Sequence, residues 1–203
     1  MKIICIGRNY SDHAKELKNE VPTKPLWFMK PDSALLLKNK PLYYPEFTKD
    51  LHYETELVFR INKAGKYIEE KYADKYYDAI AIGFDFTARD LQAEAQKKGT
   101  PWEIAKAFDS SAALSEFIPI EEFRDLNDIN FSMKRNGMMV QKGNSSEMIF
   151  SIEKIISYVS RFVTLKIGDL IYTGTPAGVG PVEIGDFLEA YIEGKLMLKT
   201  EIK

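Results

Sequence analysis

The chain has 203 residues, of which 45% are hydrophobic, so it is long enough to bury a substantial core. Its formal net charge is −2 and its pI is about 5.8, and the absence of a basic stripe argues against binding to nucleic acid or to an anionic membrane surface. No apolar run reaches the length of a membrane span and Cys5 has no cysteine partner, so we expect a cytoplasmic protein with one domain over residues 1–203.

The N-terminal segment predicts a short strand followed by a short helix. Residues 3–7 form an apolar run that ends at a glycine, and Ser11 then offers a helix cap. On that helix His13 and Glu16 share a face, the arrangement in which a carboxylate orients a general base. A solvated helix face explains the same spacing. Two prolines in the following loop suggest that residues 10–25 form a lid.

Residues 52–61 alternate with a period of two, after short strands predicted at 26–29 and 34–37. One face of this predicted strand is apolar, whereas the other carries Glu54 and Glu56. Like charges on neighbouring positions of one face repel unless a cation lies between them. The pattern indicates a metal site, and a solvent-facing edge strand is the alternative.

A second acidic signal lies in residues 79–86, an apolar run that predicts a buried strand containing Asp85. An unpaired carboxylate in such a strand is costly, so we expect it to have a partner. Carboxylates without thiolates suit Mg²⁺, Mn²⁺ or Ca²⁺ better than zinc. The strand leads into a helix for which Thr87 is the expected cap and Gly99 the stop.

The second half of the chain offers one charged candidate and several packing elements. Lys106 lies among apolar neighbours and either presents its charge to an anionic substrate or extends to the surface. The Asn-Gly pair at 136–137 predicts a hairpin turn. Residues 148–163 carry an apolar stripe that predicts a packing helix, and Gly-Asp turns at 168–169 and 185–186 each lead into a strand.

The glycine-rich loop at residues 173–180 superficially suggests phosphate binding. It lacks the Gly-Lys-Ser/Thr ending of a P-loop and no helix follows it, which argues against a nucleotide site. Free backbone N–H groups in such a loop can still hold a carboxylate.

Five stretches form one combination that extends over almost the whole chain. They are Gly7-Arg8-Asn9-Tyr10 with Asp12-His13, His52 to Glu56, Asp85 to Asp90, Lys97-Lys98-Gly99 with Pro101-Trp102, and Thr173-Gly174-Thr175-Pro176 with Gly178 and Gly180. This combination resembles the fumarylacetoacetate hydrolase superfamily, and most closely its short branch of acylpyruvate hydrolases, some of which decarboxylate oxaloacetate. The chain starts at the core fold without the extra N-terminal domain of the larger members. This difference argues against fumarylacetoacetate itself as the substrate.

The resemblance implies a mainly β fold with a few helices (α+β), a mixed β-sandwich or roll of the fumarylacetoacetate hydrolase C-terminal-domain type, assembled as a homodimer. It implies that Glu54, Glu56 and Asp85 bind Mg²⁺ or Mn²⁺. By the same resemblance His52 supports these ligands without binding the metal itself. The remaining implied site residues are catalytic His13, Glu16 and Lys106 and substrate-binding Arg8, Gln92 and Thr175.

The activity implied is metal-dependent hydrolysis of the carbon–carbon bond of a 3-acylpyruvate, such as acetylpyruvate or fumarylpyruvate. In this mechanism His13, oriented by Glu16, activates a water, and the metal and Lys106 hold the pyruvate enolate. An oxaloacetate decarboxylase, or a related isomerase or tautomerase, uses the same metal site in the alternative interpretation. A non-catalytic metal-binding or ligand-binding protein is the third.

Overall fold

The computed structural model describes residues 1–16 and 20–203, and its central element is a mixed sheet of eight strands. The strands follow the order β2-β1-β12-β5-β6-β8-β3, with β9 also paired to β6. Only the pairs β1–β12 and β3–β8 are parallel among these described strands. The bounds are β1 Ile3–Gly7, β2 Leu26–Lys30, β3 Leu35–Leu36, β5 Thr55–Ile61, β6 Tyr77–Asp85, β8 Ala112–Leu114, β9 Ile118–Pro119 and β12 Leu170–Tyr172.

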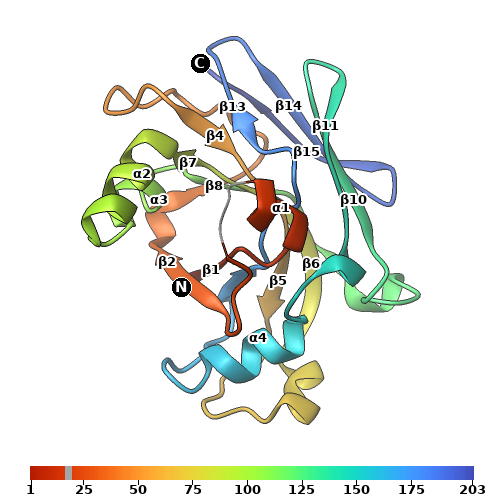
Figure 1. Cartoon of the computed structure of the whole chain (residues 1–203). Helices are drawn as coiled ribbons and strands as arrows, with labels where there is room; N and C mark the ends of the chain where they lie inside the picture. The colour runs from red at the N-terminus through yellow and green to blue at the C-terminus, as the bar shows by residue number, and fades with distance from the viewer. Residues whose placement is uncertain (17–19) are drawn as a thin grey trace.

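Two smaller sheets complete the β structure, and Figure 1 shows them beside the central strands. The four-stranded antiparallel sheet contains β10 Asn130–Arg135, β11 Met138–Asn144, β14 Phe187–Ile192 and β15 Lys195–Glu201. The three-stranded sheet contains β4 Leu51–Tyr53, β7 Thr87–Ala88 and β13 Gly180–Pro181. The predicted mainly β fold with a few helices is confirmed.

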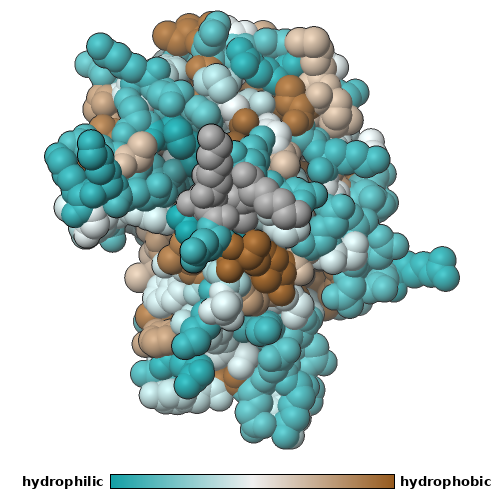
Figure 2. All heavy atoms as spheres, in the orientation of Figure 1, coloured by the Kyte–Doolittle hydropathy of each residue, from teal (hydrophilic) through white to brown (hydrophobic). Residues whose placement is uncertain are grey.

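The described helices are short and lie outside the sheets. They are α1 Ser11–Glu16, α2 Arg89–Lys98, α3 Glu103–Lys106 and α4 Ile152–Val159, with 3-10 turns η1 Asp32–Ala34, η2 Glu70–Tyr76, η3 Ile120–Glu122 and η4 Ser145–Glu147. In Figure 1, α2 and α3 lie together beside β7, and α4 lies at the lower end of the molecule. Within the described part of the chain, no helix is long and apolar enough to cross a membrane. Figure 2 shows a largely hydrophilic face with separate hydrophobic groups.

Both faces of the central strands are buried, so the period-two pattern of residues 52–61 does not mark a solvent-facing edge. β5 lies between β12 and β6 in the sheet. Leu57 and Phe59 belong to the larger hydrophobic cluster, whereas Val58 belongs to a second cluster on the other face. The acids that share the face of Val58 are therefore held inside the protein.

Two helix predictions need correction. The helix expected over residues 148–163 is shorter, because Ser151 caps α4 at Ile152 and a 3-10 turn, η4, precedes it. Thr87 does not cap α2, since its backbone pairs with His52 in the small sheet and its hydroxyl donates to the carbonyl of Asp85 at 3.3 Å.

Two turn predictions are confirmed by the backbone angles. Gly99 ends α2 in the left-handed conformation, with φ of 65°. Asn136 and Gly137 have φ of 52° and 80° and connect β10 to β11 through the mirror-image turn that suits a twisted hairpin. This hairpin brings Gln141 towards the centre of the molecule.

Candidate metal centre and active site

Three carboxylates meet at the ends of the central strands. Glu56 lies in β5, Asp85 is the last residue of β6, and Glu54 precedes β5. The N–H of Asp85 donates to the carbonyl of Glu54 at 2.8 Å, which fixes the two strands side by side at this level. One carboxylate oxygen from each residue lies within 4.8 Å of the others, and all three side chains are buried. An all-oxygen donor set of this kind suits a hard divalent cation.

Three basic side chains surround two of these acids. The Nζ of Lys106 lies 2.8 Å from Oε2 of Glu54 and 2.8 Å from Oδ2 of Asp85. The Nζ of Lys30 lies 2.8 Å from Oδ1 of Asp85, and Arg89 contacts Oε1 of Glu54 at 2.5 Å. Sequence reasoning assigned no role to Lys30 or Arg89. For Lys30 a signal was present, a basic residue that ends an apolar strand, but nothing local indicated its partner.

Glu56 differs from the other two acids because no cation contacts it among the described residues. Its Oε2 accepts the N–H of Gly174 at 2.7 Å, and no hydrogen bond to Oε1 is present in this part of the chain. Burial, followed by the charges of Asp85 and Glu54, raises the pKa of Glu56 well above its ordinary value. Burial acts against ionisation of Glu54 as well, but the charges of Lys106 and Arg89 lower the pKa of Glu54. A divalent cation fits this site because it would place a compensating positive charge beside Glu56.

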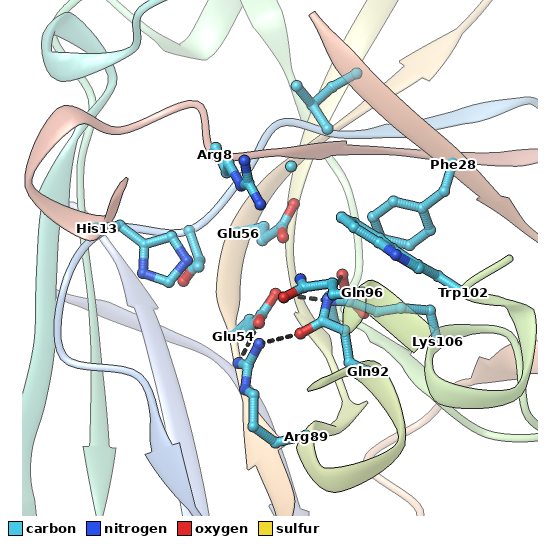
Figure 3. Close-up of a pocket in the computed structure, with 14 residues that line it drawn as sticks. Arg8, His13, Phe28, Glu54, Glu56, Arg89, Gln92, Gln96, Trp102 and Lys106 are labelled. Atoms are coloured by element: carbon cyan, nitrogen blue, oxygen red, sulfur yellow. Dashed lines mark hydrogen bonds and ion pairs between the residues drawn. The ribbon is translucent and has the colours of Figure 1, made fainter. Parts of the chain in front are cut away.

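A histidine–carboxylate pair lies across the cavity from the Phe28–Trp102 wall, as Figure 3 shows for His13. The Nδ1 of His13 is 3.3 Å from Oε2 of Glu16, and the imidazole is buried. Its Nε2 makes no hydrogen bond to the residues that the structure describes. The geometry therefore leaves one imidazole nitrogen available to exchange a proton with a ligand.

The glycine-rich loop is tied to the central sheet by a glutamine that sequence reasoning did not select. Gln141 accepts the N–H of Thr55 at 3.0 Å and donates to Oγ1 of Thr175 at 2.8 Å and to the carbonyl of Pro176 at 3.0 Å. The loop thereby presents Thr175 to the cavity. Gln141 is 86 positions from Thr55, so no local pattern could predict the contact.

Arg8 enters the cavity from a strained backbone position. Its φ of 59° lies in the left-handed region, which is uncommon for a residue other than glycine. The neighbouring Asn9 holds this geometry, because its Nδ2 donates to the carbonyls of Phe150 at 3.0 Å and Thr173 at 2.8 Å. The guanidinium of Arg8 has no hydrogen-bond or ion-pair partner among the described residues. An anionic ligand is a natural partner for it.

These groups border one small cavity of about 40 Å³, enough for roughly three waters. Eight of the nine predicted site residues line it, and Glu16 lies behind His13. The rings of Phe28 and Trp102, 6.0 Å apart, form an apolar wall. His52 is outside this lining and its Nε2 contacts Oδ1 of Asp50 at 2.9 Å, so its support of the acids stays a prediction.

Known proteins are similar to this chain over almost its whole length. Residues 2–203 match the family profile described as fumarylacetoacetate (FAA) hydrolase C-terminal. A mitochondrial protein of Mus musculus named oxaloacetate tautomerase is 44% identical over 201 residues, covering 99% of this chain and 91% of its own. The mitochondrial oxaloacetate decarboxylase of Dictyostelium discoideum is 42% identical over 194 residues, covering 95% and 89%. A crystal structure of fumarylpyruvate hydrolase from Pseudomonas aeruginosa with Mn²⁺ and pyruvate matches with a TM-score of 0.95 and 36% identity, covering 100% and 89%.

Proposed function

Because this chain belongs to the fumarylacetoacetate hydrolase family, we propose that it is a divalent-metal-dependent enzyme that acts on small 2-oxo acids through an enol or enolate. Oxaloacetate is the first candidate substrate, and its keto–enol tautomerisation the first candidate reaction. The observation that carries the proposal is the cluster of Glu54, Glu56 and Asp85 on one cavity with His13, whose imidazole contacts Glu16. The names of the relatives in Mus musculus and Dictyostelium discoideum support this substrate.

Glu54, Glu56 and Asp85 are the proposed ligands for Mg²⁺ or Mn²⁺. When bound, such a cation supplies a Lewis acid that stabilises negative charge on the 2-oxo oxygen. The structural neighbour that was crystallised with Mn²⁺ and pyruvate supports both the cofactor class and a pyruvyl ligand.

The basic groups on the cavity are proposed to position the substrate. Arg8 has a guanidinium without a hydrogen-bond or ion-pair partner among the described residues, and the ammonium of Lys106 lies beside Glu54 and Asp85, so a dianion such as oxaloacetate can meet two positive charges on this cavity. Thr175 and Gln92 offer neutral hydrogen-bonding groups on the same cavity.

His13 is the proposed proton carrier. In tautomerisation it removes a proton from the carbon next to the 2-oxo group of oxaloacetate, or returns one, while Glu16 holds the imidazole through Nδ1. Electron density from the broken C–H bond moves towards the oxo oxygen, which gains the proton in the enol product. The free Nε2 of His13 is the atom that performs this transfer.

Hydrolysis of 3-acylpyruvates is the second candidate function, supported by the neighbour named fumarylpyruvate hydrolase. In that reaction His13 takes a proton from a water that attacks the acyl carbonyl, and breakage of the carbon–carbon bond releases a carboxylic acid and pyruvate enolate. Decarboxylation of oxaloacetate produces this enolate without an attacking water. Tautomerisation, hydrolysis and decarboxylation therefore share the substrate-binding groups, and they differ in the proton that His13 must move.

A substrate panel tests the proposal. Purified protein is assayed for oxaloacetate tautomerisation, oxaloacetate decarboxylation, and hydrolysis of acetylpyruvate and fumarylpyruvate, each with Mg²⁺, with Mn²⁺ and with a chelator. We expect the largest metal-dependent rate for oxaloacetate tautomerisation. Metal-dependent binding of oxalate without turnover of any substrate would instead support a non-catalytic binding protein.

The proposal also covers the domain, the lid, the oligomeric state and the cellular location. We treat residues 1–203 as one catalytic domain in which residues 10–25 form a lid over the cavity. The described part of this segment includes α1, whereas residues 17–19 lie outside the described chain. Assembly as a homodimer and a cytoplasmic location stay predictions; the relatives named above from Mus musculus and Dictyostelium discoideum are mitochondrial.

A further inference from the structure

The two lysines next to Asp85 are held in different ways. The Nζ of Lys30 contacts Asp85 and also donates to the carbonyls of Ser111 at 2.9 Å and Phe86 at 3.3 Å. It is therefore anchored by the backbone as well as by the carboxylate. The Nζ of Lys106 has carboxylates as its only hydrogen-bond partners among the described residues, Oε2 of Glu54 and Oδ2 of Asp85, both at 2.8 Å.

A basic side chain lies within 2.8 Å of each carboxylate oxygen of Glu54 and Asp85, although the contact of Lys30 with Oδ1 of Asp85 is an ion pair without hydrogen-bond geometry. Arg89 contacts Oε1 of Glu54, Lys30 contacts Oδ1 of Asp85, and Lys106 bridges the remaining two oxygens. Two of the three proposed metal ligands thus have their charge compensated by the protein's own side chains. A divalent cation that binds here must compete with at least one of them.

Lys106 competes most directly with a divalent cation for the ligand oxygens. It bridges two of the proposed ligands, whereas each of its neighbours contacts one. Its side chain also lines the cavity, whereas Lys30 does not, and its Nζ lies 5.1 Å from the centre of the Phe28 ring. The ammonium can therefore turn towards the cavity and the face of this ring without leaving a polar partner of the backbone unsatisfied.

We infer that Lys106 is a resident counter-cation of the metal-free site, and that a divalent cation displaces its ammonium from Glu54 and Asp85 into the substrate cavity. This inference rests on the metal site of the proposed function. Two consequences follow from it. Lys106 weakens metal binding because its positive charge competes for the same oxygens, and it becomes available to a substrate carboxylate or enolate only after the metal has bound.

Titration calorimetry with Mn²⁺ tests the competition. We expect Lys106→Met to bind Mn²⁺ tighter than the unmodified protein by about tenfold or more, because a competing charge within contact distance is removed. Lys30→Met is the matched control, since it removes the same charge at the same 2.8 Å distance from Asp85 without freeing Glu54. Its gain should be smaller. Unchanged or weaker binding by Lys106→Met, or equal gains in both variants, would overturn the displacement.

A second measurement follows the ammonium directly. In protein with ¹⁵N-labelled lysines, the side-chain signals of Lys106 and Lys30 are assigned from the two variants, and Mg²⁺ is then added. We expect the Lys106 signal to shift or broaden and the Lys30 signal to persist. A Lys106 signal that does not respond to saturating Mg²⁺ contradicts the inference.

The controls separate this inference from the metal site on which it depends. Thermal melting of each variant without metal shows whether it is folded, and Lys106→Gln replaces Lys106→Met if the latter is not. Absence of Mn²⁺ binding in the unmodified protein and in all folded variants would refute both the metal site and the inference. Mn²⁺ binding that needs Glu56 but is unaffected by Lys106 would refute the inference alone.

Discussion

Glu16 accepts the backbone N–H of Gly178 with both carboxylate oxygens, at 3.1 and 3.2 Å, although 162 positions separate the two residues. The same carboxylate contacts Nδ1 of His13. The glycine-rich loop therefore helps to place the proposed base, and α1 is tied to this loop in the described structure.

Because Gly178 is part of this contact, we expect Gly178→Ala to lower the stability of the protein. The φ of Gly178 is 97°, and an added Cβ would overlap the carbonyl oxygen of Val140, so the loop must shift and release Glu16. Gly185→Ala is the matched control, because its φ of 98° is almost the same but nothing lies within 4 Å of the added Cβ. In urea denaturation we expect Gly178→Ala to lose about 1–3 kcal/mol more stability than Gly185→Ala. Equal losses would show that backbone strain alone matters.

Replacing Glu56 and replacing Asp85 should have different effects on the stability of the metal-free protein. Glu56 is buried without a cation contact among the described residues, so Glu56→Gln should leave the free energy of unfolding unchanged or raise it. Asp85→Asn removes the carboxylate shared by Lys30 and Lys106 and should cost about 3–5 kcal/mol, the usual result of breaking a buried ion pair. Chemical denaturation in a chelating buffer measures both. A larger loss for Glu56→Gln than for Asp85→Asn would contradict this assignment of charges.

Metal addition should stabilise the protein through the same acids. At a Mn²⁺ concentration of about 100 times its dissociation constant, binding to the folded state alone contributes about 2.7 kcal/mol. We expect a corresponding rise in melting temperature, reversed by a chelator and absent in Glu56→Gln. A rise of the same size in that variant would place the cation elsewhere.

We expect His13→Ala to lower the reaction rates without lowering the affinity for metal or for oxalate. The variant keeps Glu54, Glu56 and Asp85, so its affinity for Mn²⁺ and oxalate should stay nearly unchanged. Tautomerisation of oxaloacetate and hydrolysis of acylpyruvates should fall about 10²–10⁴-fold, the usual contribution of a positioned general base. Decarboxylation of oxaloacetate should fall less, because no proton has to be removed before the carbon–carbon bond breaks. If steady-state assays with matched metal saturation show equal losses in all three reactions, His13 acts on closure of the site instead.

We expect Asp90 to account for part of the stability that the protein loses at low pH. Burial opposes its ionisation, but hydrogen bonds from the N–H of Lys49 at 3.0 Å and the hydroxyl of Thr48 at 2.6 Å lower the pKa of Asp90. A folded-state pKa below the unfolded value, about 3.9, means that the stabilisation is present above that pH and is lost as the pH falls through the folded-state pKa. Asp90→Asn should therefore lower stability at neutral pH and flatten its decline below about pH 4. Urea denaturation of both proteins across this pH range measures the difference.

Local patterns in the sequence determined much of the candidate site. The alternation of residues 52–61 placed Glu54 and Glu56 on one face, and the apolar run around Asp85 marked a buried acid. The hairpin turn at 136–137 and the end of α2 at Gly99 were equally local, because each depends on a residue that tolerates positive φ. Strand period and turn chemistry act over a few residues, so they can be read without a partner.

Tertiary structure alone decided which charges face these acids and where the loops are anchored. Lys30 reaches Asp85, 55 positions away, although β1, β12 and β5 lie between β2 and β6 in the sheet order, so the contact depends on how the whole sheet curls. Gln141 joins Thr55 to the glycine-rich loop in the same way, and its strand carries no local sign of that contact. The direction of a side chain along one strand follows from its own sequence. Its neighbours follow from strand order, register and packing, which depend on the free energy of the whole fold.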